Sequence, residues 1–137
     1  MKTLLTLSLT LLSLVTFAQA ASTKPLTAEF KYNDASIQDA ISKNKVQFVL
    51  QNISNSIQLD RFAETSQYYK NDFLVIITPG DSNGGKVCLV NFLNNKTNMG
   101  ELIRLFSSNG IEEVTYDSKK MPTATFFAKF NAANTAK

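Results

Sequence analysis

The chain has 137 residues, a formal net charge of +3, one cysteine and no histidine. The lack of histidine excludes Ser-His-Asp and Cys-His nucleophilic systems together with histidine-ligated metal sites, and a single cysteine cannot form an internal disulfide. Charged residues are scattered along the chain without a basic block, which argues against binding to nucleic acid or to a membrane surface.

The first twenty residues have the pattern of a targeting segment. Lys2 supplies a positive start, residues 4–17 are apolar apart from Ser and Thr, and Ala18-Gln19-Ala20 fits a small-x-small cleavage site. A membrane anchor is the alternative, but the run is short and diluted by hydroxyl groups. We therefore predict a signal peptide at residues 1–20, a mature protein that is periplasmic or secreted, and no integral membrane segment after cleavage.

The remaining residues, about 117 in number, are the size of one domain. Residues 21–44 are predicted to form an N-terminal extension in which residues 26–32 alternate like an edge strand. Asp34 is expected to cap a short helix, because Ile37, Ala40 and Ile41 share one helical face.

Residues 45–92 carry the clearest local signals. Residues 45–51 alternate like a strand, and Asn55 with Gln58 has the spacing of a capping box at the start of a helix that runs to about residue 70. Two further strands, residues 73–77 and 86–92, flank a glycine-rich segment and predict a hairpin.

The last third of the chain repeats the pattern. Asn98 and Glu101 again have capping-box spacing, and Asn109-Gly110 is a typical helix end. Residues 111–116 are predicted to be a strand. Residues 118–137 are predicted to be a C-terminal extension in which 123–130 alternate like one more strand before a tail.

Residues 45–117 thus follow the order strand, helix, strand, strand, helix, strand. This order predicts an α+β fold, the ferredoxin-like βαββαβ sandwich, with a four-stranded antiparallel sheet and two helices on one face. The other face is expected to be open to solvent, to a protein partner, or to the terminal segments. The phenylalanines at 126, 127 and 130 are expected to lie in the core or, if that face stays uncovered, to form an apolar patch on it.

The stretch at residues 52–58, with the turn Asn109-Gly110-Ile111, resembles the heavy-metal-associated (HMA) domain of copper chaperones. The family's G-M-x-C-x-x-C loop would place its Met at Ile53 and its two cysteines at Asn55 and Gln58. The resemblance implies a ferredoxin-like fold, whereas amides are poor ligands for monovalent copper, so the metal-carrying activity is not expected here. The degenerate metal-loop positions are Ile53, Ser54, Asn55, Ser56 and Gln58, for which the capping box is the simpler interpretation.

Other candidate sites are weaker. The segment 79–85 with Lys86 lacks the spacing of a phosphate-binding loop. Asp60 and Glu64 are expected to be solvated, and Glu112 and Glu113 to point to opposite sides of a strand. No catalytic residue is therefore assigned.

The sequence favours an exported, non-catalytic binding or interaction module with no cofactor. A metal-handling protein that uses the soft ligands Cys88, Met99 or Met121 is the alternative, although Cys88 is expected to be buried. A hydrolase that uses carboxylates alone is a third hypothesis.

Overall fold

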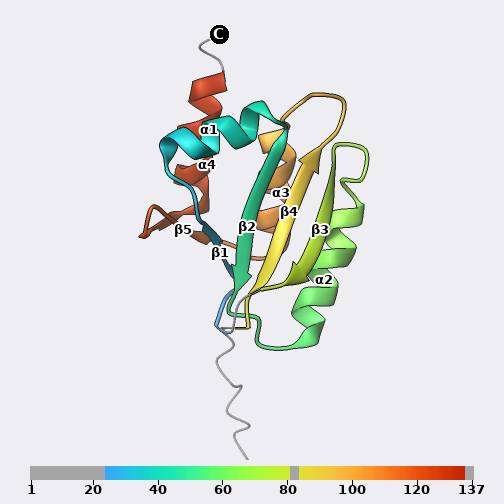
Figure 1. The fold of residues 1–137 in the computed structure, drawn as a ribbon. Helices are drawn as coiled ribbons and strands as arrows, with labels where there is room; N and C mark the ends of the chain where they lie inside the picture. Colours follow the sequence, from blue (N-terminus) through green and yellow to red (C-terminus); the bar gives the residue numbers. More distant parts are fainter. Residues whose placement is uncertain (1–23, 81–83, 135–137) are drawn as a thin grey trace, which may run out of the picture.

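The computed structural model describes residues 24–80 and 84–134. They form a six-stranded mixed sheet and four helices, and Figure 1 shows α2 and α3 packed behind the sheet with α1 across one end of it. The predicted signal peptide lies outside the described residues. In chain order the elements are β1 Thr27–Phe30, α1 Asp34–Ser42, β2 Lys45–Gln51, α2 Ser56–Gln67, β3 Phe73–Pro79, β4 Lys86–Phe92, α3 Met99–Ser108, β5 Glu113–Tyr116, β6 Lys119–Pro122 and α4 Thr123–Asn134.

The strand order is β3-β4-β2-β1-β5-β6, with β1 and β5 parallel and every other pair antiparallel. The prediction of a four-stranded antiparallel ferredoxin-like sandwich with two helices is therefore wrong. β1 is a central strand, because Ala28 pairs with Leu50 on one side and with Val114 on the other. Its two inward side chains, Ala28 and Phe30, are both buried in the core, and this burial stabilises the central position.

The C-terminal segment is also different from its prediction. Residues 123–134 form the helix α4, and the four residues with helical spacing, Thr123, Phe126, Phe127 and Phe130, are all buried. The strand β6, which the sequence did not indicate, pairs with β5 through a two-residue turn at Asp117 and Ser118. Both turn residues have positive φ, 49° and 60°, as two-residue hairpin turns of the primed type require.

Asparagine side chains begin three of the helices. At α1 the cap is Asn33 and not the predicted Asp34: its Oδ1 accepts from the Ser36 N–H at 2.8 Å, while the Ser36 hydroxyl accepts from the Asn33 N–H at 2.9 Å. At α3 the cap is Asn98, as predicted, and its Oδ1 accepts from the Glu101 N–H at 3.3 Å. Each bond satisfies a backbone donor that a helix start leaves unpaired.

The core lies between the sheet and the helices and is rich in aromatic rings. Phe30 and Phe126 have ring centroids 4.3 Å apart, and Phe48 and Phe106 meet edge to face at 5.0 Å. These contacts join β1, β2, α3 and α4, and such pairs add to the stabilisation from burial. Cys88 on β4 belongs to the same core, which confirms its prediction as a buried residue.

Candidate functional site

The sheet has one covered face and one open face. On β2 the side chains of Val46, Phe48 and Leu50 are buried toward the helices, so Gln47 and Gln51 point to the opposite side. Figure 1 shows β2, β4 and β3 from this opposite side, and no described helix covers them. We call this side the open face.

One half of the open face is apolar. Leu74 and Ile76 on β3 are 50% and 49% exposed, and the strand register places Ile76 beside Leu89 of β4. Val87 lies on the same side of β4, two residues from Leu89. We call Leu74, Ile76, Val87 and Leu89 the apolar strip.

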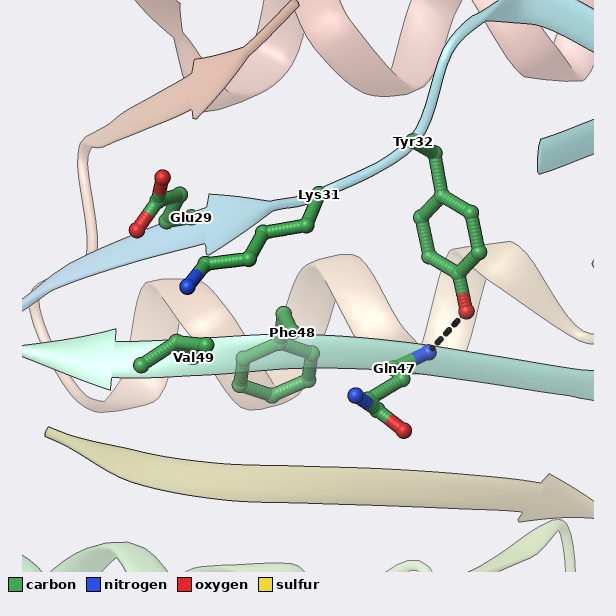
Figure 2. Close-up of a pocket in the computed structure, with 6 residues that line it drawn as sticks. All are labelled: Glu29, Lys31, Tyr32, Gln47, Phe48 and Val49. Atoms are coloured by element: carbon green, nitrogen blue, oxygen red, sulfur yellow. Dashed lines mark hydrogen bonds between the residues drawn. The ribbon is translucent and has the colours of Figure 1, made fainter. Parts of the chain in front are cut away.

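The other half of the open face is polar, and the sheet opens there. The pairing of β1 with β2 ends at Glu29 opposite Val49, and beyond that point the Gln47 N–H donates to the Tyr32 hydroxyl oxygen at 3.0 Å. The resulting hollow has a volume of about 200 Å³. Figure 2 shows the side chains that line it between the diverging strands. Its lining residues are Glu29, Lys31, Tyr32, Gln47, Phe48 and Val49.

The hollow offers hydrogen-bonding groups of several kinds. Glu29 accepts from the Gln51 side-chain amide at 2.6 Å, and Figure 2 shows the Lys31 side chain running between the strands toward Glu29. The Tyr32 oxygen accepts from Gln47, so the phenolic hydrogen can still donate. The hollow therefore presents a carboxylate, an ammonium group, a phenol and an amide, which together can donate and accept hydrogen bonds.

A second hollow adjoins the first. It measures about 300 Å³, shares Glu29, Lys31 and Tyr32 with the first hollow, and extends to the β5–β6 turn at Asp117 and Ser118. The polar half of the open face is therefore hollowed and lined by charges of both signs, next to an apolar strip whose four side chains carry no charge.

The predicted degenerate metal loop is a helix cap. The Asn55 Oδ1 accepts from the Gln58 N–H at 3.0 Å, and the Gln58 Oε1 accepts from the Ser54 N–H at 2.7 Å. The predicted capping box is thus half formed, since the return bond of Gln58 reaches Ser54 and not Asn55. Ile53 packs against the core, whereas Ser54 and Ser56 are exposed.

Among the described residues, the three sulfur-containing side chains lie on three different elements. Cys88 lies on the covered side of β4, Met99 is buried at the start of α3, and Met121 is half-buried on β6. Burial raises the pKa of the Cys88 thiol to about 12, so at neutral pH it is not the thiolate that binds soft metals. Within residues 24–80 and 84–134, no group of three or more cysteine or carboxylate side chains is arranged to hold a metal ion.

The predicted carboxylate pairs do not build a site. Asp60 and Glu64 are both exposed on α2. Glu113 forms an ion pair with Lys120 across the β5–β6 hairpin at 3.2 Å, and Glu112 is exposed just before β5. A surface ion pair of this kind contributes little to stability and performs no chemistry by itself.

One charged cluster was not predicted. The Asp34 Oδ1 accepts from Lys129 Nζ at 2.7 Å and from the Tyr116 hydroxyl at 2.6 Å. The hydrogen bond from Lys129, followed by that from Tyr116, lowers the pKa of Asp34, while burial and the Asp34 carboxylate raise the pKa of Tyr116. The three residues join α1, β5 and α4. Tyr116 is 82 residues and Lys129 is 95 residues from Asp34 in the sequence, so no local pattern could have revealed the contact.

None of the helices within the described ranges is both long and apolar enough to cross a bilayer. No model of a known protein family matches the chain, and neither a curated protein nor a solved structure matches it.

Proposed function

We propose that the chain is an exported binding module without catalytic activity, and that it binds a protein partner across the open face of its sheet. The observation that carries the proposal is the half-exposure of Leu74 and Ile76 on a sheet face that no described helix covers. Export is proposed on the basis of residues 1–20 alone.

The open face has the composition of a protein interface. Interfaces combine a largely apolar centre with a polar, hydrogen-bonding rim, and here the apolar strip lies beside the hollow at Glu29, Tyr32 and Gln47. Covering the exposed surface of Leu74 and Ile76 removes apolar area from water, at about 25 cal/mol for each Å². The polar groups beside the strip supply orientation through hydrogen bonds.

The open face is tested with Leu89→Lys, which places a charge in the centre of the apolar strip. The matched control is Ile57→Lys, because Ile57 is 72% exposed on α2, behind the sheet. In capture from the native envelope extract followed by direct binding of the purified partner, the wild type and Ile57→Lys are expected to bind and Leu89→Lys to lose binding. Equal binding by all three, with unchanged circular dichroism, would contradict the proposal.

Export is tested by N-terminal sequencing of the protein produced in its native host. Cleavage after Ala20 predicts a mature chain that begins at Ala21. Recovery of the chain inside the cell with residues 1–20 still attached would show that the segment is not processed.

A further inference from the structure

The two edges of the sheet differ in how they are protected against pairing with another strand. β6 has only four residues, and they include Lys119, Lys120 and Pro122. Lysine, proline and short length are the usual devices that prevent edge-to-edge association. β3 has seven residues with the sequence FLVIITP and carries no charge, and its only such device is Pro79 at its end.

The β3 edge also has unpaired main-chain groups. The Leu93 N–H donates to the Asp72 oxygen and the Gly80 N–H to the Gly85 oxygen, so even-numbered residues of this strand point toward β4. Val75 and Ile77 consequently point their N–H and C=O groups outward, and within the described residues no hydrogen bond reaches them. Pro79 is also at an outward position, where its missing N–H costs no bond to β4.

We infer that β3 pairs antiparallel with β3 of a second copy of this chain and joins two six-stranded sheets into one of twelve strands. In the register centred on Ile76 the two strands overlap along their whole length. The end pair of Phe73 and Pro79 forms no main-chain bond, because the Phe73 N–H donates to the Tyr69 oxygen and proline has no N–H. Val75 of each copy then lies opposite Ile77 of the other. These two symmetry-related pairs form four main-chain hydrogen bonds in total.

A second copy fits this edge better than an unrelated chain does because the strand is compatible with itself. The two Ile76 side chains meet as a non-hydrogen-bonded pair, the arrangement in which side chains are closest. Leu74 lies opposite Thr78, so a two-fold axis brings together no like charges along the strand. This pairing uses the main chain of the sheet edge and therefore goes beyond the proposed function, which concerns the open face. The dimer would also place the apolar strips of the two copies side by side.

The sharpest test exploits the Ile76 pair. Ile76→Lys and Ile76→Glu each place like charges directly opposite one another, so each variant alone is expected to dimerise about tenfold or more weakly than the wild type. An equimolar mixture is expected to form a heterodimer because the opposite residues now carry opposite charges. Light scattering after size exclusion and analytical ultracentrifugation measure the mass, and the wild type is expected to have twice that of one copy.

Two more variants complete the test. Val75→Pro removes an outward N–H and is expected to be monomeric, whereas Leu89→Lys, one strand inside the edge, is expected to remain dimeric. The inference is overturned by a wild type that stays monomeric up to millimolar concentration, by a dimer that persists in Ile76→Lys, or by a mixture that fails to pair. These outcomes leave the proposed function standing, because its own test measures the response of partner binding to Leu89→Lys.

Discussion

Cys88 and Leu89 are neighbours on β4 and lie on opposite faces of the sheet. Cys88 is completely buried among core residues, whereas Leu89 is partly exposed in the apolar strip. The covered face packs against side chains from all four helices, and the open face leaves aliphatic side chains in contact with water. Burial, and with it the expected stabilisation, is thus concentrated on the covered face.

The largest expected effect is at the centre of the covered face. Phe126→Ala removes a ring that contacts Phe30 and Tyr116, and it is expected to lower the free energy of unfolding by about 3–5 kcal/mol. Leu74→Ala on the open face is the control and is expected to cost about 1 kcal/mol or less. Urea unfolding followed by circular dichroism measures both free energies, and equal losses would show that the two faces contribute equally to stability.

The two faces of β4 are expected to respond differently to a polar substitution. Cys88→Ser places a hydroxyl in the apolar core and is expected to cost about 1–3 kcal/mol, while Leu89→Thr on the other face is expected to cost about 1 kcal/mol at most. Thermal unfolding of the two variants against the wild type provides the measurement. If Leu89→Thr were the more damaging change, the open face would be part of the core.

Cys88 also predicts a dependence on pH. Burial raises the thiol pKa from 9.0 to about 12, so the folded state disfavours the thiolate. The contribution to stability is fully present below pH 9.0 and is lost as the pH rises through about 12. Unfolding free energies measured across this alkaline range should fall more steeply for the wild type than for Cys88→Ser.

The cap of α2 is expected to have a smaller effect. α2 packs behind β3, and Asn55→Ala removes the acceptor of the Gln58 N–H, at a cost of about 1 kcal/mol. Ser56→Ala, one residue later, is the control because no hydrogen bond of its side chain contributes to the cap. A loss of stability in Asn55→Ala that does not exceed that in Ser56→Ala would mean that the amide is not a structural cap.

The smallest effect is expected at the contact that joins α1, β5 and α4. The hydrogen bonds from Lys129 and Tyr116 lower the pKa of Asp34. The stability that they contribute is therefore present above the ordinary pKa of 3.8 and is lost as the pH falls through the lowered pKa. Asp34→Asn should therefore flatten the acid limb of the stability curve, and Tyr116→Phe should flatten it partly. An acid limb that is unchanged in both variants would show that the cluster does not contribute.

Local signals in the sequence predicted most elements between residues 45 and 108. The strand at 45–51, the helix that follows Asn55, the hairpin of β3 and β4, and the helix that follows Asn98 all appear at or close to their predicted positions. Each depends on interactions within a few residues, such as a cap or an alternation. The same signals wrongly predicted a strand at residues 123–130. Phenylalanine and alanine alternate there, but the buried residues also have the spacing of a helix, and the segment is helical.

The fold and the site depended on contacts that are distant in sequence. An edge strand and a central strand with one buried face alternate identically, so periodicity could not show that β1 inserts between β2 and β5. A continuous apolar run such as residues 73–77 has no alternation that distinguishes one face from the other, so it gave no indication that Leu74 and Ile76 are half exposed. Asn55 and Gln58, by contrast, were recognisable as a cap from their spacing alone.

Residue identity and near neighbours were enough to predict the caps of α2 and α3, the burial of Cys88 and the absence of histidine chemistry. At α1 the same signals indicated Asp34, one residue after the cap that the structure has. The three-dimensional packing was needed to show which strands are neighbours, which sheet face stays open and which edge lacks protection. Strand pairing is chosen by the burial of whole faces and by hydrogen bonds between distant segments, and no short stretch of the chain contains that information.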